Sequence, residues 1–263
     1  MSSYEKFKAE GAAEIAALGQ DRDIAAATRT WMDRVNPLKY SYHFEWMGRP
    51  IIQYPQDIVA VQELIWQVKP DLVIETGIAH GGSLILSASM LALIDLSEAI
   101  DRSTTLDPRM SKRKVIGIDI DIRPHNREAI SRHSMASRIQ MIEGSAVAPE
   151  VVAKVRSAAE KYQRVLVFLD SMHSHAHVLG ELEAYGQLVS VGSYCVVFDT
   201  VIEDMPAGSF PDRPWNKDDN PKTAVRAYLN AHPEFEIDKS IDSKLLITVA
   251  PDGFLRRRAH TGS

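Results

Sequence analysis

From residue 71 to residue 199, short apolar runs rich in β-branched residues alternate with longer runs of helical periodicity. This alternation predicts a parallel sheet, because parallel strands need long crossovers and helices usually supply them. Such crossovers are right-handed, and ligands of such sheets bind beyond the carboxyl ends of the strands. The expected strands are 71–75, 114–119, 138–142, 164–170 and 193–199, and the expected helices between them are 83–98, 125–133, 147–160 and 175–189.

The segments on either side of this core complete the expected fold. Residues 3–34 have spaced apolar positions that predict one or two amphipathic helices, and residues 56–68 predict another helix after an irregular aromatic stretch. Beyond a loop rich in Pro, Asp and Gly, a helix is expected at 221–231, followed by β-rich pieces at 234–239 and 244–249. The short link between these two pieces favours a closing antiparallel hairpin. We therefore expect an α/β fold with a mostly parallel seven-stranded sheet and a helical N-terminal extension.

Size and composition favour one main domain. The chain has 263 residues, of which 45% are hydrophobic and 25% are charged, which suffices for one substantial core. We expect residues 1–60 to form a helical and aromatic extension and residues 61–257 to form the sheet domain. The net charge is −5, and the basic stretches at 112–114 and 256–258 are too short to track a polyanion. Nucleic acid is therefore not an expected partner.

Cysteine usage and the distribution of apolar residues predict where the protein resides. Cys195 is the only cysteine and lies in an apolar strand, which favours a buried thiol in a reducing compartment. The first residues lack the apolar core of a signal peptide, and no window is expected to reach the ~20 apolar residues of a membrane span. We expect a cytoplasmic protein without a transmembrane segment, and a homo-oligomer if the N-terminal helices pair with another subunit.

The first expected strand ends in an acid and runs into a glycine turn that opens a helix. Glu75 closes the strand, and Gly77, Gly81 and Ser83 follow. Glycines let a ligand approach the backbone closely, and an acid at the strand tip suits a cation or an amine better than a pyrophosphate. The glycine spacing also differs from the Gly-x-Gly-x-x-Gly pattern of dinucleotide sites. The segment therefore predicts a nucleotide-like ligand, and the alternative is a tight turn without one.

The next two strands also end in polar residues. Asp119 closes the second strand and is a candidate to accept the hydroxyls of a ribose, with Asp121 behind it. The alternative for either aspartate is a solvated acid that caps the following helix. Ser145 follows the third strand and is a weaker candidate to border a purine.

The fourth and fifth strands both end in an aspartate, namely Asp170 and Asp199. Neighbouring strand ends lie ~5 Å apart, so these carboxylates repel each other unless a divalent cation lies between them. Oxygen ligands of this kind suit magnesium, calcium or manganese. The sequence thus predicts a metal site, with simple surface acids as the alternative. Glu203 and Asp204 could supply a third oxygen ligand, but a solvated acidic loop is the favoured account of these two residues.

Three histidines follow Asp170 within the segment 171–177. A zinc site is not favoured, because only His173 and His177 share a helical face and the His-Glu-x-x-His pattern is missing. The unperturbed pKa of histidine lies near neutrality, so one histidine beside a metal-bound hydroxyl can act as a general base. His173 is the candidate base, and ordinary packing at a helix start is the alternative.

Several motifs in one order closely resemble the family named after cephalosporin hydroxylase, which also includes rhamnosyl O-methyltransferases. The resemblance covers about residues 40 to 257 and implies an S-adenosylmethionine-dependent methyltransferase with a Rossmann-like sheet and a magnesium site. An antiparallel last strand is typical of methyltransferase sheets. The motifs that carry the resemblance are Trp46–Gln53, Pro55–Asp57, Glu75–Ser83, Gly117–Asn126, Asp170–His175 and Pro251–Arg257.

The resemblance also implies roles for single residues. The resemblance assigns cofactor binding to Glu75, Gly77, Gly81, Ser83 and Asp119, and the cation to Asp170 and Asp199. Asp121, Ser145 and Asp170 are further cofactor candidates, and Asp170 is also a catalytic candidate beside His173. One departure is notable, because Phe198 stands where the family often has an acid, and Thr200 takes the place of an amide ligand seen in related metal-dependent enzymes.

These observations predict an O-methyltransferase in which a divalent cation, Mg²⁺ or another, binds the acceptor and His173 takes its proton. The expected acceptor is a hydroxyl of a sugar, glycan or glycosylated metabolite, which rests on the resemblance alone. One alternative is an oxidoreductase or hydroxylase, as the family name indicates, although no two-His-one-carboxylate triad is evident. The other is a non-catalytic cofactor-binding subunit, for which Phe198 is the best argument.

Overall fold

The computed structural model describes residues 2–259, and its core is one seven-stranded sheet. The strand order is β5-β4-β3-β6-β7-β9-β8; the first five strands are parallel, and β9 is antiparallel to both of its neighbours. The predicted fold class, including the antiparallel end of the sheet, is confirmed. The sheet strands are β3 (Leu72–Thr76), β4 (Lys114–Asp119), β5 (Ile139–Glu143), β6 (Val165–Leu169), β7 (Tyr194–Val197), β8 (Phe235–Ile237) and β9 (Phe254–Arg257).

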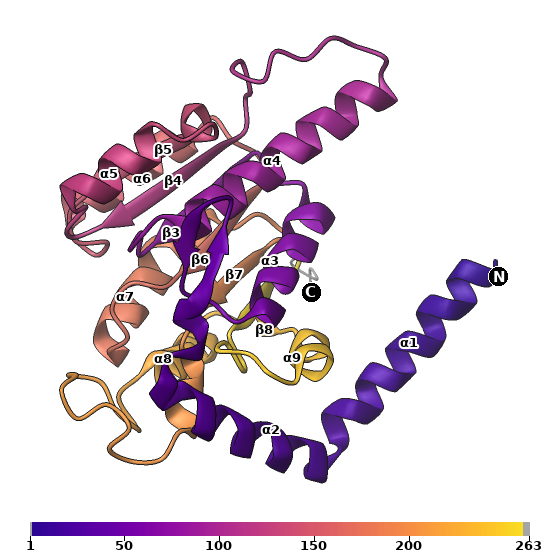
Figure 1. Cartoon of the computed structure of the whole chain (residues 1–263), viewed down its shortest axis with the longest axis vertical. Coiled ribbons are helices and arrows are strands. Elements are labelled where there is room, and N and C mark those ends of the chain that lie inside the picture. Colours follow the sequence, from indigo (N-terminus) through magenta and orange to yellow (C-terminus); the bar gives the residue numbers. More distant parts are fainter. Residues whose placement is uncertain (1, 260–263) are drawn as a thin grey trace.

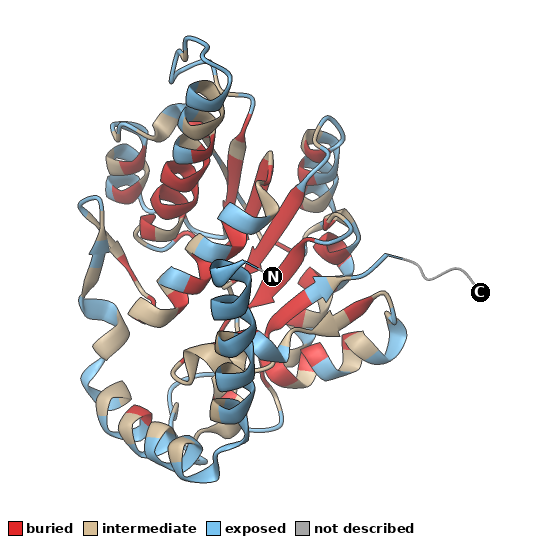
Figure 2. Cartoon of the chain, turned by 90° about the vertical axis from the view of Figure 1, so that its right-hand side faces the viewer, coloured by how far each residue is buried: buried red, intermediate tan, exposed pale blue. Residues whose placement is uncertain are grey.

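Helices cover both faces of this sheet (Figure 1). Strand residues alternate between two buried apolar clusters: Val73 packs with α3 and α4 on one face, whereas Ile74 packs with α6, α7 and α8 on the other. The sheet is therefore almost continuously buried (Figure 2), as expected for strands covered on both faces. The helices are α1 (Ser3–Gln20), α2 (Arg22–Val35), α3 (Pro55–Val68), α4 (Gly82–Asp101), α5 (Pro124–Ser131), α6 (Pro149–Ala159), α7 (His175–Tyr185), α8 (Pro221–Ala231) and α9 (Lys239–Leu245).

The expected terminal hairpin is only half right. β8 forms where predicted, but the segment 244–249 is not a strand, and the partner of β8 is β9. Asp238 caps α9 by accepting a hydrogen bond from the Ser240 amide, so the supposed link is helical. The apolar run after α9 is tied to α3 instead, because the Asp57 carboxylate accepts hydrogen bonds from the Thr248 hydroxyl and the Val249 amide.

The aromatic stretch before α3 has more regular structure than expected. A small hairpin, β1 (Phe44–Trp46) and β2 (Arg49–Ile51), forms at this point. The boundary expected between residues 60 and 61 falls inside α3, where Ala60 and Val61 are buried in one cluster with Met32 and Tyr54.

Helix α4 corrects one expectation. By length and composition alone it could cross a membrane, since an 18-residue window has a mean hydropathy of 1.6. Half of that window is buried inside the protein, where α4 packs against α3 and β4. The helix is therefore accounted for by its place in the core beside the sheet.

Candidate active site

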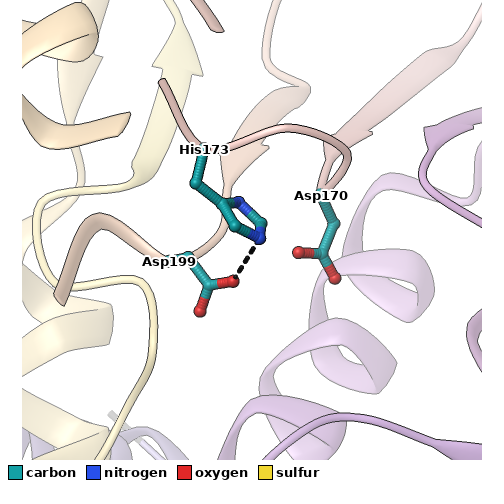
Figure 3. A group of neighbouring side chains, drawn as sticks. All are labelled: Asp170, His173 and Asp199. Carbon is teal, nitrogen blue, oxygen red and sulfur yellow. Dashed lines mark ion pairs between the residues drawn. The ribbon is translucent and has the colours of Figure 1, made fainter. Parts of the chain in front are cut away.

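The structure brings Asp170, His173 and Asp199 together at the carboxyl end of the sheet (Figure 3). Asp170 follows β6 and Asp199 follows β7, and these two strands are parallel neighbours with Leu169 opposite Val197. One ligand atom from each of the three side chains lies within 4.8 Å of the other two. Their role as ligands stays a prediction, but the geometry suits a cation.

His173 lies in the loop before α7 and pairs with Asp199. Its Nε2 is 3.1 Å from Asp199 Oδ2 (Figure 3). The indole of Trp215 meets the imidazole edge-on, with ring centroids 4.8 Å apart, and the Arg213 guanidinium lies 5.3 Å from the Trp215 ring centroid. These contacts hold the imidazole at one side of the carboxylate pair.

The site holds an excess of buried negative charge. Burial raises the pKa of Asp170 well above its ordinary value, and the nearby carboxylates of Asp199 and Glu75 raise it further. Burial also raises the pKa of Glu75, to about 7, although hydrogen bonds from Ser87 and Ser83 oppose that shift. Within residues 2–259, no lysine or arginine pairs with these three carboxylates, and Asp199 has only His173. Such a cluster favours bound cations.

The glycine turn lies directly against the metal candidates. Gly77 has a φ of +87°, and a Cβ atom there would overlap the carbonyl oxygen of Asp170. Gly81 has a φ of +85° and precedes α4, and a Cβ atom there would overlap the Ile130 side chain. Both positions therefore require glycine, because a left-handed backbone and a close neighbour occur together.

A cavity of about 560 Å³ joins these parts, which is ample for a drug-sized ligand. One wall is the glycine turn with Ser83, and another is the trio Asp170, His173 and Asp199. Segments far apart in the chain complete the lining, namely the stretch before α3 and the loop from Met205 to Trp215.

The candidates for the ribose and the purine lie elsewhere. Asp119 Oδ2 accepts hydrogen bonds from the amides of Ile78 (2.8 Å) and Ala79 (3.2 Å), so this carboxylate braces the glycine turn. Asp121 is exposed, with its carboxylate 4.0 Å from Arg123, and Ser145 is half-buried after β5. Among the described residues, these three do not line the 560 Å³ cavity.

Two residues at the end of β7 differ from what the resemblance implies. Thr200 is fully buried, and its hydroxyl donates to the Pro251 carbonyl (2.7 Å), so the structure does not place it with the carboxylates as a third ligand. Phe198 is also buried and packs against Phe168, with ring centroids 6.1 Å apart. The position that often holds an acid in the family therefore contributes to the apolar core in this chain.

Sequence reasoning assigned no role to Gln53, although its motif was noted. Its amide Nε2 donates to Asp170 Oδ2 at 3.1 Å, across 117 positions of sequence. The one sequence signal for a role of Gln53 is its position just before Pro55, which opens α3, because residues ahead of a helix start often lie at an edge of the fold.

Comparison with known proteins agrees with this architecture. The sequence model of the family described as rhamnosyl O-methyltransferase/CmcI matches residues 38–258. A rhamnosyl O-methyltransferase of Mycobacterium leprae is 28% identical over 219 residues, covering 81% of this chain and 82% of the relative. A protein of the same name from Mycobacterium tuberculosis is 27% identical over 220 residues, covering 81% and 77%.

Solved structures of CmcI share the fold. An apo form named CmcI-N160 has a TM-score of 0.51 at 19% identity, covering 83% of this chain and 77% of that one. A form named CmcI-D160 Mg-SAM, after magnesium and S-adenosylmethionine, has a TM-score of 0.51 at 18% identity, covering 83% of this chain and 78% of that one. The family match spans most of the sequence, and the resemblance noted in the motifs is confirmed. The chain belongs to the rhamnosyl O-methyltransferase/CmcI family of O-methyltransferases.

Proposed function

We propose that this O-methyltransferase transfers a methyl group from S-adenosylmethionine to a hydroxyl of a sugar or glycosylated metabolite, assisted by a divalent cation. The observation that carries the proposal is the meeting of Asp170, His173 and Asp199 with the Gly77 turn in one cavity. That arrangement supplies a place for a cofactor, a cation and an acceptor side by side.

The residues present fit a divalent cation. Asp170 and Asp199 supply carboxylate oxygens, and no lysine or arginine in residues 2–259 neutralises them. Magnesium and S-adenosylmethionine are named for a CmcI structure of the same fold, which supports the same pair in this chain. A cation bound there would polarise the acceptor hydroxyl and lower its pKa.

Side chains of the protein would accept the hydroxyl proton and align the acceptor oxygen with the methyl group. The acceptor oxygen attacks the methyl carbon, the carbon–sulfur bond breaks, and its electron pair stays on sulfur. His173 accepts the hydroxyl proton, and the adjacent Asp199 carboxylate stabilises the resulting imidazolium. Alignment of oxygen, methyl carbon and sulfur supplies several kcal/mol of the rate enhancement.

The cofactor assignments remain part of this proposal. Gly77, Gly81 and Ser83 border the cavity or shape its turn, and Glu75 is buried beside them. Asp119 acts on the cofactor through the turn that it braces, since its carboxylate already accepts two amides of that turn. Asp121 and Ser145 lie farther out, at the ends of neighbouring strands, where the adenosine end would extend.

Sugars are the favoured acceptors because the mycobacterial relatives are named for rhamnosyl methylation. The cavity is lined by aromatic and polar side chains that suit a sugar ring, and the aromatic ones include Tyr42 and Trp215. We also propose a homo-oligomer, because α1 exposes Tyr4 and Phe7 and buries none of its own residues.

A radiolabelled methyl-transfer assay on rhamnose-containing glycosides tests the function, with Mg²⁺ or with EDTA. We expect transfer that EDTA abolishes and that falls at least ~100-fold in Asp170→Asn, because the cation loses a charged ligand. Glu150→Gln, on the exposed start of α6, is the matched control and should retain full activity. Equal turnover in Asp170→Asn would remove the cation from the mechanism.

Two rival functions are separated by binding and by turnover. Calorimetric titration with NAD, 2-oxoglutarate and S-adenosylmethionine distinguishes an oxidoreductase or hydroxylase, which would bind NAD or 2-oxoglutarate and not S-adenosylmethionine. A non-catalytic subunit would bind S-adenosylmethionine yet transfer no methyl group to any acceptor. Phe198 is the feature that favours this second rival, but its side chain lies in the core beside Phe168.

A further inference from the structure

Gln53 lines the proposed cofactor site and has a buried hydrogen-bond acceptor without a partner among the described residues. The side chain is only 6% exposed, and its Nε2 donates to Asp170 Oδ2. Its other polar atom, Oε1, is buried and has no hydrogen-bond partner in the described part of the chain. An unsatisfied buried acceptor costs roughly 1–3 kcal/mol, so a ligand that donates to it binds with advantage.

The orientation of the amide follows from its neighbour. The NH₂ group of Gln53 donates to Asp170 Oδ2, so the carbonyl oxygen of the same amide faces away from that carboxyl group. Gln53 lines the 560 Å³ cavity and also a small recess of about 20 Å³, shared with Glu75, Ser83 and Asp170. That recess has room for one water molecule or one small polar group of a ligand.

The charges around the recess select a positively charged donor. Glu75 and Asp170 both border it, and neither has a lysine or arginine partner within residues 2–259. A primary ammonium group has three donors and no acceptor, so it can bond Gln53 Oε1 and a carboxylate together. A carboxylate ligand would be repelled from the same place.

The nearby start of α4 suits the opposite charge. Gly81 is its N-cap and supplies no side-chain cap, so the first amides of this 20-residue helix lack intrahelical partners. Together the recess and the helix start match the two charges of an α-amino acid, with the ammonium at Gln53 and the carboxylate at the helix.

We propose that Gln53 recognises the α-ammonium group of the donor's methionine moiety, which it contacts through Oε1 while its NH₂ group holds Asp170. This assignment rests on the proposed function and names a binding residue for it. Gln53 thereby links two tasks, because the same amide contacts the cofactor and orients a carboxylate proposed to hold the cation.

The test compares two ligands rather than one. Calorimetry measures the affinity of S-adenosylhomocysteine and of its analogue lacking the α-amino group, for the wild type and for Gln53→Met. We expect the preference for the amino-bearing ligand to fall about tenfold in Gln53→Met, which corresponds to one lost hydrogen bond of ~1.4 kcal/mol. Changes in the rest of the cavity that affect both ligands alike cancel in this ratio.

Gln53→Glu is the matched control, because it keeps an oxygen at the same distance from the backbone and should retain the preference. If circular dichroism shows that Gln53→Met does not fold, Gln53→Asn replaces it, since it withdraws the amide by one methylene. An unchanged preference in a folded variant would overturn the assignment and leave Gln53 as a support for Asp170. If the wild type binds neither ligand, the methyltransferase proposal is wrong, and the assignment of Gln53 is wrong with it.

Discussion

At the scale of single residues, Gly77 controls how closely the glycine turn approaches Asp170. Gly77→Ala should cost about 2 kcal/mol more stability than Gly192→Ala, because both positions have a positive φ but only Gly77 has a neighbour in the way of a Cβ. Thermal and urea denaturation of the two variants measure the difference. Equal costs would mean that the turn moves freely away from Asp170, contrary to the structure.

Asp57 gives a residue-scale prediction about pH. Burial raises the pKa of this carboxyl from 3.8 to about 7, against hydrogen bonds from Thr248 and Val249. The folded state therefore holds the proton more tightly than the unfolded chain, so this stabilisation is complete below about pH 4 and is lost as the pH rises through 7. Asp57→Asn should flatten the fall in the free energy of unfolding between pH 5 and 8 by about 2 kcal/mol.

Urea denaturation at several pH values measures that slope. Asp212→Asn, an exposed loop residue, should leave the wild-type slope intact. The slope will be reduced rather than abolished in Asp57→Asn, because burial shifts the pKa of Glu75 in the same direction. Parallel curves for the wild type and Asp57→Asn would show that the carboxyl is not held protonated in the folded state.

The sequence predicted which residues meet, but not how each side chain points. Asp170 and Asp199 were predictable because residues that end neighbouring parallel strands must lie near one another. The direction of a side chain beyond a strand depends on the turn that follows. Asp199 adopts a left-handed φ of 56°, and Thr200 begins a 3₁₀ turn that directs its hydroxyl to Pro251. No periodicity in the sequence signals that reversal.

At the scale of elements, a cluster of ion pairs fastens the second half of α4 to the strands beside it. Asp95 on α4 accepts hydrogen bonds from Arg138 (2.6 Å) and Arg113, and Arg113 also bonds Glu98. Burial alone would raise the pKa of Asp95, but the hydrogen bond from Ser111 and the two guanidiniums hold it below its usual value. The cluster therefore balances the charges that it buries.

Arg138→Ala should destabilise the protein by about 3 kcal/mol, because it removes one of the two guanidiniums that balance the Asp95 carboxylate and leaves a cavity where its own buried side chain was. Arg132→Ala is the matched control, since that arginine is 80% exposed and its pair with Glu128 on α5 should contribute less than about 0.5 kcal/mol. Chemical denaturation compares the two. Similar losses would show that the cluster near α4 contributes no more than an exposed pair.

Elements were predictable wherever their periodicity was long. The five parallel strands are buried on both faces of the sheet. The four crossover helices cover these faces, each with one apolar side. Residues 244–249 have the composition of a strand, yet the competing hydrogen bonds of Asp57 and the cap at Asp238 decide their structure. Both competitors lie outside the segment, so local propensity could not reveal them.

At the scale of the whole molecule, the strand order explains why one site collects residues from so many segments. The chain runs outward from β3 to β4 and β5 and then returns to the other side of β3 as β6, and this reversal opens a crevice at the carboxyl end of β3. The glycine turn follows β3, and the carboxylates of Asp170 and Asp199 follow β6 and β7 on one side of it. The topology alone thus places the proposed cofactor turn beside the proposed cation site.

The two N-terminal helices differ in how far they belong to the folded core. Helix α1 packs along α9 at the edge of this core but has no buried residue, whereas α2 buries Met32 and places Trp31 against Tyr40 and Tyr54. Deleting residues 1–20 should therefore change the free energy of unfolding by less than about 1 kcal/mol, whereas deleting residues 1–35 should cost more than about 3 kcal/mol.

Light scattering on the same two truncations tests the proposed homo-oligomer. If α1 joins subunits through Tyr4 and Phe7, which are 65% and 69% exposed, deleting residues 1–20 should lower the mass to that of one chain while the melting temperature changes by only a few degrees. An oligomer that survives this deletion would place the contact on another surface. A large loss of stability on removing α1 alone would show instead that the helix belongs to the folded core, because a segment with no buried side chain gives up little on leaving a monomer.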